Sequence, residues 1–392
     1  MKIAFCATTS EPLKDIRHWL QWNRAIGVSR FYLFVQGRAG TAANVAALGR
    51  EPGVTVVPDD EELRAAHASS RIWNETWLSA FFHKPCNHEL FVLQSLNMER
   101  AIQLAQRDGV DWLLHIDTDE LVHPGGTRHF SLQEVLAAVA PEVDVLVFPN
   151  HESLPERADV RDPFLEVTLF KRNYQHVQGE LYSRNYAAVA HGNPNYFITY
   201  ANGKAAARVQ PGLRPNGAHR WNNYAKAVRE ETSAATGVLH YTYNRLSDFK
   251  NRRDRCDCAP TEEDAKRCFI LPFDRLAFSA GIPAGRRRPG ALLRGPPALE
   301  RHQAQVRAAP ARLEGVAAPL ARLRPAFDGA VNASTPPPPS PSPIAPPQDR
   351  PPNPFVALLQ QPPPASPTEP AAQATGGAAV ALPPPGPLVV TA

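Results

Sequence analysis

The chain has 392 residues and a formal net charge of +4, and 27 of its 41 prolines fall after residue 280. That last segment carries ten arginines and five acidic residues, so residues 1–280 are left with 32 basic and 33 acidic residues, a net charge of −1. This balance excludes the strongly basic surface of a nucleic-acid-binding protein, and no apolar run in the sequence reaches the roughly 18 residues of a membrane span.

Residues 281–392 differ in composition from the rest of the chain. Stretches such as PPPPSPSPIAPP and PPPGP lack backbone hydrogen-bond donors and have no periodic apolar face. We expect a disordered or locally polyproline II tail, whose removal after Ala280 should leave the thermal midpoint nearly unchanged. Residues 1–280 are then expected to form one α/β domain.

The first part of the chain alternates between strand and helix patterns. KIAFCAT (2–8), RFYLFVQG (30–37) and VTVVP (54–58) are short runs rich in strand formers. EPLKDIRHWLQWNRAIGV and TAANVAALGREPG, which lie between them, have the spacing and stop signals of helices. This order predicts a mixed, mostly parallel sheet with right-handed crossovers, flanked by helices.

A long helix and a buried strand come next. ELFVLQSLNMERAIQLAQRD (89–108) has the most helical pattern, Gly109 is expected to end it, and VDWLLHI (110–116) is typical of a buried strand. SLQEVLAAVA then predicts a helix, and VDVLVFP, FLEVTLFKR and ATGVLHYTY (235–243) predict strands. The stretch from 172 to 235 is polar and rich in aromatic residues.

Asp117, Asp119 and Glu120 follow the predicted strand at 110–116 directly. Ligands bind at the carboxyl edge of such a sheet, and two nearby carboxylates repel each other unless a cation or a proton lies between them. Mg²⁺ or Mn²⁺ suits carboxylate oxygens and also binds phosphate, so the motif indicates a metal that bridges to a diphosphate. A calcium loop and an aspartyl-phosphate phosphatase fit the following residues less well, and a simple turn remains open.

The five cysteines are Cys6, Cys86, Cys256, Cys258 and Cys268. The odd number leaves at least one thiol free if the others pair. The last three cysteines are close together in the sequence, but a zinc site would need a fourth ligand and no neighbouring residue supplies one. This favours a local disulfide or reduced packing over a metal site.

Several motifs in the same order resemble a known family. SEPLKDIRHWLQWNRAIGVSRFYLF and DWLLHIDTDELVHP resemble the GT-A glycosyltransferases of the family 2 and family 92 type. WNETWLSAFFHKPCNHELFVLQSLNMERAI, GNPNYFITYANGKAAARV, LRPNGAHRW and RRDRCDCAPTEEDAKRCF resemble plant and green-algal glycosyltransferase-like proteins of the KOBITO kind. The resemblance covers residues 1–280 and implies a GT-A fold, a nucleotide-sugar donor and a glycan acceptor, for example in cell-wall polysaccharide synthesis.

The resemblance also implies a metal site. Asp117 and Asp119 would form the DxD element that holds Mn²⁺ or Mg²⁺ against the nucleotide-sugar diphosphate. GT-A enzymes often add a late histidine, and we prefer His240 on its predicted strand to His219 in GAHRW; packing of a strand histidine is an open alternative. His115 is expected to face the core.

Other site residues follow from chemistry rather than from a motif. Lys204 and Arg208 are candidates for contact with phosphate or acceptor, with solvated strand positions as the equal alternative. Glu11 lies where a nucleotide base or ribose would approach, or is an acid favoured in the first turn of a helix. An inverting transferase needs a base, and the acids after the metal motif are Glu152, Glu156, Asp159 and Glu166, among which the spacing selects none.

The sequence therefore predicts a metal-dependent glycosyltransferase. Its rival is a non-catalytic scaffold with the same fold that acts in polysaccharide assembly, and a third reading is a metal-dependent phosphatase. The family resemblance suggests the Golgi membrane or lumen, with an amino-terminal anchor encoded upstream of Met1; a chain that starts at Met1 would be cytoplasmic. Two Asn-x-Ser/Thr sites, at Asn74 and Asn332, would be glycosylated only in a secretory lumen.

Overall fold

The computed structural model describes residues 1–155, 159–171, 173, 197, 199–245, 248, 258–259 and 261–280. The predicted tail at 281–392, the candidate base Glu156 and the second glycosylation site at Asn332 lie outside the described residues.

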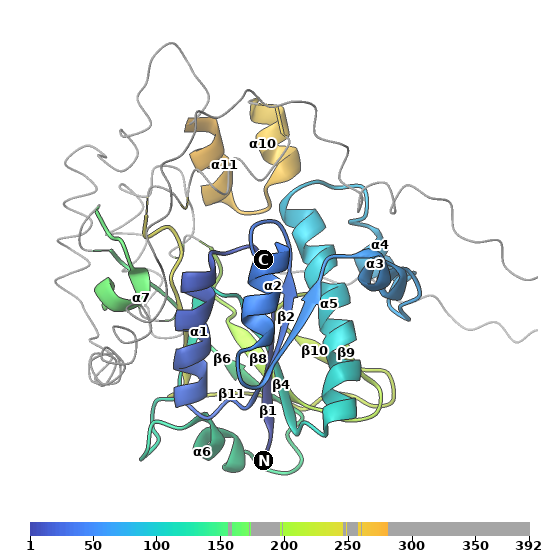
Figure 1. The fold of residues 1–392 in the computed structure, drawn as a ribbon, viewed down its shortest axis with the longest axis vertical. Coiled ribbons are helices and arrows are strands. Elements are labelled where there is room, and N and C mark those ends of the chain that lie inside the picture. The colour runs from blue at the N-terminus through green and yellow to red at the C-terminus, as the bar shows by residue number, and fades with distance from the viewer. Residues whose placement is uncertain are drawn as a thin grey trace, which may run out of the picture.

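A seven-stranded sheet forms the centre of the domain, in the order β11-β6-β8-β4-β1-β2-β3 (Figure 1). Its strands are β1 (Ile3–Thr9), β2 (Arg30–Val35), β3 (Val54–Pro58), β4 (Trp112–His115), β6 (Val145–Phe148), β8 (Lys204–Arg208) and β11 (Glu230–Thr232). All neighbours pair in parallel except that β8 runs antiparallel to both β4 and β6. The predicted mixed, mostly parallel sheet is confirmed.

Helices cover both faces of this sheet (Figure 1). The described helices of the chain are α1 (Leu13–Ala25), α2 (Ala42–Gly49), α3 (Glu61–Ala68), α4 (Thr76–Ser79), α5 (Asn87–Asp108), α6 (Leu132–Ala137), α7 (Pro163–Glu166), α10 (Glu262–Cys268) and α11 (Pro272–Ala280). Because side chains alternate along a strand, β1 buries Phe5 against Trp19 of α1 and the adjacent Cys6 in the cluster of Met98 from α5. Both faces of β1 therefore pack against apolar clusters.

A second, three-stranded sheet extends the domain beyond the carboxyl end of β4. In it β12 (Gly237–His240) lies between β5 (Glu120–His123), to which it is antiparallel, and β7 (Asn150–Glu152), to which it is parallel. Two tryptophans of α1 hold β5 in place: Trp19 Nε1 donates to the Glu120 carbonyl at 3.0 Å and Trp22 Nε1 to the Val122 carbonyl at 2.8 Å. A hairpin of β9 (Leu213–Pro215) and β10 (Trp221–Asn223) completes the described strands.

Two sequence predictions need correction. The strand predicted in FLEVTLFKR is not formed, because Pro163 begins the single helical turn α7 and the buried residues Phe164, Val167 and Phe170 recur every third position rather than every second. The alternative of solvated strand positions for Lys204 and Arg208 is correct for the strand, which forms as β8, but wrong for the solvation of Lys204, which is fully buried. The strand was only an alternative because its sequence KAAAR is poor in strand formers. By contrast Gly109 ends α5 in the left-handed conformation (φ +63°), as predicted.

Some of the cysteines form disulfides, and one is a free thiol in the hydrophobic core. Cys258 and Cys268 form a disulfide, so of the two alternatives for that segment, a local disulfide or reduced packing, the disulfide is observed; Cys86 is also disulfide-bonded. Cys6 is the buried free thiol among the described residues.

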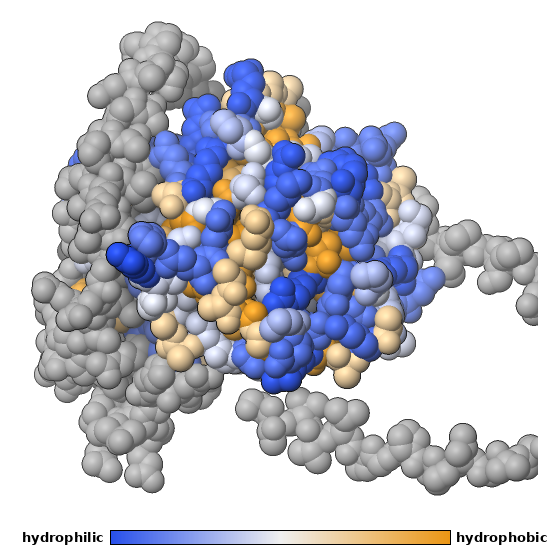
Figure 2. All heavy atoms as spheres, turned by 90° about the horizontal axis from the view of Figure 1, so that it is seen from below, coloured by the Kyte–Doolittle hydropathy of each residue, from blue (hydrophilic) through white to orange (hydrophobic). Residues whose placement is uncertain are grey.

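The face of the described part that Figure 2 shows is mostly polar. On the face in Figure 2 hydrophobic residues occur in small groups between hydrophilic ones. None of the described helices combines the length and the apolar character that a bilayer crossing requires. Asn74 and Thr76 of the first glycosylation site are both exposed, so the predicted site is accessible on the surface.

Candidate functional site

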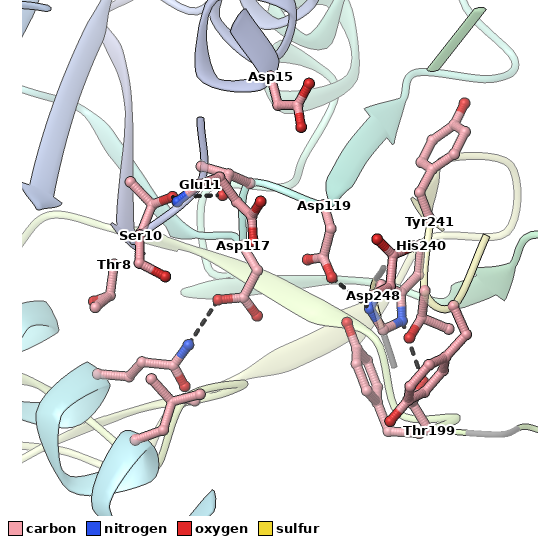
Figure 3. A pocket seen from close by; sticks show the side chains of 18 of the residues that line it. Thr8, Ser10, Glu11, Asp15, Asp117, Asp119, Thr199, His240, Tyr241 and Asp248 are labelled. Atoms are coloured by element: carbon pink, nitrogen blue, oxygen red, sulfur yellow. Dashed lines mark hydrogen bonds and ion pairs between the residues drawn. The ribbon is translucent and has the colours of Figure 1, made fainter. Parts of the chain in front are cut away.

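A pocket of about 330 Å³ opens beyond the carboxyl ends of β1, β4 and β12 (Figure 3). Six carboxylate residues line it together with a single arginine, Arg245, and two histidines; the acids are Glu11, Asp15, Asp117, Asp119, Asp162 and Asp248. Loops at the carboxyl edge of parallel strands converge here, as the sequence predicted for the DxD element. The described lining is therefore strongly acidic.

Asp117 is held by two groups of the protein itself. Its Oδ1 atom accepts a hydrogen bond from Gln94 Nε2 of α5 at 2.7 Å, and its Oδ2 atom lies 2.8 Å from Lys204 Nζ. Burial tends to raise the pKa of Asp117, but the Lys204 ammonium outweighs it and holds that pKa well below its ordinary value. Both carboxylate oxygens of Asp117 thus already have partners.

Lys204 lies beneath the pocket rather than in it. Its side chain is fully buried, and Nζ also lies 3.5 Å from Oε2 of the fully buried Glu120. Burial alone would lower the pKa of Lys204, but Asp117 and Glu120 raise it instead, so the ammonium stays charged. The prediction that Lys204 meets phosphate or acceptor is corrected, because β8 directs this side chain between two carboxylates under the floor of the pocket.

Asp119 and His240 face each other across the pocket wall (Figure 3). His240 is opposite Glu120 in the register of β12 and β5, and the Tyr241 amide donates to the Asp119 carbonyl at 2.8 Å. His240 Nε2 consequently lies 3.6 Å from Asp119 Oδ2, while the Asp119 side chain keeps 48% of its surface exposed. Burial tends to lower the pKa of His240, but the nearby Asp119 carboxylate raises it.

The other two predicted histidines have backbone partners. His219 lines the pocket, packs edge-on against Tyr200 at 4.3 Å between ring centroids, and bonds the Gly203 carbonyl through Nδ1 at 3.0 Å. Burial lowers its pKa well below the ordinary value. His115 faces the core as expected, with Nδ1 2.8 Å from the Ala218 carbonyl.

Arg208 is at the opposite edge of the sheet. Because β8 is antiparallel to β4, its last residue pairs with Trp112 at the amino end of β4. Its guanidinium bonds the carbonyl of Val143 at 2.8 Å and stacks 4.4 Å from the Trp112 ring centroid. Arg208 is therefore corrected from a phosphate contact to a structural residue.

The predicted bases also lie elsewhere. Glu152 is fully buried on β7, the strand that pairs with β12, where it bonds Thr199 and lies 3.6 Å from Lys171 Nζ. Asp159 is exposed and does not line the pocket. Glu11, at the end of β1, does line it, and its amide donates to Thr9 Oγ1 at 3.1 Å.

Several pocket residues were not predicted from the sequence. Asp15 of α1 and Asp248 both pair with Arg245, at 3.4 and 3.0 Å, and Asp162 pairs with His18 at 3.2 Å. The contact of Asp15 with Arg245 joins residues 230 positions apart, so no local spacing indicates it, whereas Arg245 and Asp248 are only three residues apart. The one sequence signal is that Asp15 lies in the first turn of α1, shortly after β1, which places it near the same edge.

The metal ligands predicted from the sequence are only partly assembled. Within the described ranges no three His, Cys, Asp or Glu side chains converge as a ready metal site. Asp119 and His240 supply one carboxylate and one imidazole facing the same pocket. Mg²⁺ or Mn²⁺ is commonly bound by one or two side chains with phosphate and water completing the sphere, so these two residues fit an ion shared with a bound diphosphate.

The sequence aligns with named proteins over most of the folded part. A stretch of 277 residues is 54% identical to one Arabidopsis thaliana protein and 52% identical to another, and both are named glycosyltransferase-like. Over this stretch the chain is similar to proteins named glycosyltransferase-like. The aligned part covers 71% of this chain but only 54% and 61% of the two relatives, so it spans little more than half of their length. No family model matches the chain.

Solved structures match only distantly. A mannosyltransferase from Pyrobaculum calidifontis, in complex with GDP-Man and Mn²⁺, aligns with 85% of this chain and 88% of its own at 10% identity, with a TM-score of 0.30. A 4-diphosphocytidyl-2C-methyl-D-erythritol synthase from Anaerococcus prevotii aligns with 53% of this chain and 71% of its own at 10% identity, with a TM-score of 0.25.

Proposed function

We propose that this domain is a metal-dependent glycosyltransferase of the GT-A type that transfers a sugar from a nucleotide-sugar donor to a glycan acceptor. The names of its homologues support the general class. The observation that carries the proposal is the facing pair of Asp119 and His240 in an acidic pocket at the carboxyl edge of the parallel strands.

The charge of the pocket supports a need for a cation. A diphosphate placed among six lining acids would be repelled, since Arg245 is the only arginine of the described lining and already pairs with two of those acids. Asp119 Oδ2 and His240 Nε2 would hold the ion. A divalent cation bound there would neutralise the diphosphate and stabilise the charge that develops on the departing nucleotide.

The remaining residues would bind and orient the donor. Asp117 cannot swing toward a ligand without breaking its bonds to Gln94 and Lys204, so it provides a fixed wall. Thr9, Ser10 and Glu11, at the end of β1, line the part of the pocket beside it. An inverting transfer also needs a base, and in place of Glu152 and Asp159 we propose the lining acids Asp15, Asp162 and Asp248 as its candidates.

One observation favours a second candidate function. Asp117 is already neutralised by the Lys204 ammonium rather than left for a metal ion. A scaffold that uses the pocket for binding without catalysis would also be compatible with this arrangement. Such a protein would bind a nucleotide or glycan but would not turn over a nucleotide sugar.

We expect Asp119→Ala to abolish metal-dependent binding of uridine or guanosine diphosphate while the protein stays folded. Calorimetry of wild type and variant, each with Mn²⁺ and with chelator, measures this directly. Asp59→Ala is the matched control, because Asp59 does not line the pocket and pairs only with the nearby Arg64 among the ion pairs of the described residues.

Undiminished affinity of folded Asp119→Ala in Mn²⁺ would overturn the assignment. Slow hydrolysis of a donor sugar nucleotide by the wild type would separate the enzyme from the scaffold, which should release no nucleotide. Turnover of a generic phosphomonoester would instead indicate a phosphatase.

A further inference from the structure

The Nδ1 side of the His240 ring contacts a pair of hydrogen-bonded polar side chains, Thr199 and Glu152, that the proposed reaction does not use. His240 and Glu152 are opposite each other in the parallel pair β12 and β7, and Thr199 bonds to both. Glu152 is fully buried and Thr199 is 7% exposed. Thr199 lines the pocket (Figure 3), whereas Glu152 is not one of its lining residues.

The direction of each hydrogen bond in this chain can be worked out. Glu152 Oε1 accepts the Thr199 amide at 2.6 Å, and the same oxygen is bonded to the Thr199 hydroxyl. Lys171 Nζ lies 3.6 Å from the other oxygen and supplies the counter-charge for a buried carboxylate. A carboxylate only accepts, so the Thr199 hydroxyl donates its proton to Glu152.

The hydroxyl therefore has only lone pairs left for His240. The Thr199 Oγ1 atom lies 3.1 Å from His240 Nδ1, so this nitrogen must carry a hydrogen and donate it. In a neutral imidazole the other nitrogen then has no hydrogen. That nitrogen is Nε2, which is the atom that faces Asp119 Oδ2 at 3.6 Å.

We propose that Thr199, oriented by Glu152, is a positioning residue that holds His240 in the Nδ1–H tautomer and presents the Nε2 lone pair to the pocket. Outer partners of this kind fix the ring orientation of metal-binding histidines in general. The tautomer is inferred from the hydrogen bonds around His240 alone. The inference that this tautomer helps to bind a divalent cation rests on the proposed function. The proposal also gives Glu152 a role in place of the base predicted from the sequence.

Long-range ¹H–¹⁵N correlation of ¹⁵N-histidine-labelled full chain, at a pH where the ring is neutral, reports the tautomer, and His240→Gln assigns the signal. We expect Nδ1–H in the wild type and in Thr199→Ser, which keeps the hydroxyl. Thr199→Val should lose this preference and give Nε2–H or a mixture. Thr242→Val is the matched control, since Thr242 is buried on the same pocket wall and no described hydrogen bond links it to His240.

An Nε2–H ring in the wild type, or an unchanged Nδ1–H ring in folded Thr199→Val, would overturn the proposal. Mn²⁺ titration followed by electron paramagnetic resonance adds a second measurement, in which Thr199→Val should bind about tenfold more weakly and Thr199→Ser should match the wild type. If the wild type binds no Mn²⁺ but shows the expected tautomers, the positioning role is supported and the metal-dependent function is not.

Discussion

The Lys204 ammonium supplies the positive charge that offsets two acidic side chains under the pocket. Its ammonium lies between Asp117 and Glu120, and both Lys204 and Glu120 are fully buried. Two carboxylates this close to each other would otherwise repel in a medium that screens charge poorly. The DxD element is therefore kept in place by a protein cation that comes from a strand 87 residues further along the chain.

We expect Lys204→Met to lower the free energy of unfolding at pH 7 by about 3–5 kcal/mol, because it leaves the partly buried Asp117 and the fully buried Glu120 without their shared counter-charge. Urea denaturation measures the change. Lys14→Met is the control: Lys14 Nζ lies 3.1 Å from Asp162 Oδ2, but its side chain is 56% exposed, so the loss should stay below about 1 kcal/mol. Equal effects of the two substitutions would contradict this account of the pocket floor.

The start of β8 decides where Lys204 lies, and Gly203 makes that start possible. Gly203 has φ +66°, and a Cβ atom there would lie 1.9 Å from the Phe148 carbonyl oxygen at the end of β6. Only glycine fits both the left-handed backbone and this close approach. The antiparallel entry of β8 between β4 and β6 thus depends on one residue.

Gly203→Ala should destabilise the domain by about 2–4 kcal/mol, since either the backbone of β6 or that of β8 must move. Gly49→Ala is the matched substitution, because Gly49 ends α2 and a Cβ atom there meets nothing within 4 Å. That variant should be neutral or gain up to about 1 kcal/mol. Thermal and urea unfolding of both variants tests the expectation, and a stable Gly203→Ala would show that the strand entry can relax.

At the scale of the whole molecule, the helix pair α10 and α11 lies beyond one end of the central sheet (Figure 1), and Asp274 of α11 connects the pair to the rest of the domain. From α11 it accepts hydrogen bonds from Asn87, the first residue of α5 (3.1 Å), and from the Tyr243 hydroxyl, just after β12. Asn87 and Tyr243 also line the pocket. Burial raises the pKa of Asp274 from its ordinary value of 3.8 to about 7.

The folded state therefore binds the Asp274 proton more tightly than the unfolded chain does. Its stabilising effect should be complete below about pH 4 and should be lost as pH rises toward about 7. Asp274→Asn removes this dependence, so the variant should gain on the wild type between pH 5 and pH 8, by up to a few kcal/mol at about 1.4 kcal/mol per pKa unit.

Urea unfolding at both pH values measures the difference. Asp264→Asn in α10 should act in the opposite sense, since Arg267, 3.0 Å away, lowers the pKa of Asp264. The same pH slope in wild type and Asp274→Asn would show that Asp274 is not the group responsible.

Local patterns in the sequence determined much of the architecture. Strand runs alternating with helical spacing predicted the parallel strands β1, β2, β3 and β4 and the long helix α5, because these periodicities arise from one segment at a time. They also placed Asp117 and Asp119 at the carboxyl edge of the sheet. The preference for His240 over His219 as a metal ligand stays a prediction, and His240 Nε2 lies 3.6 Å from Asp119 Oδ2. The single helical turn α7 was missed, because an apolar run that short has no unambiguous period.

Only the tertiary structure decided which charges meet. Lys204, Asp117 and Glu120 come together through the pairing of β8 with β4, and Arg208 is carried to the far edge because that pairing is antiparallel. Likewise Glu152 lies next to His240 and outside the pocket, because β7 and β12 lie side by side. A side chain's chemistry depends on its partners and its burial, and strands far apart in sequence supply both only after the sheet has formed.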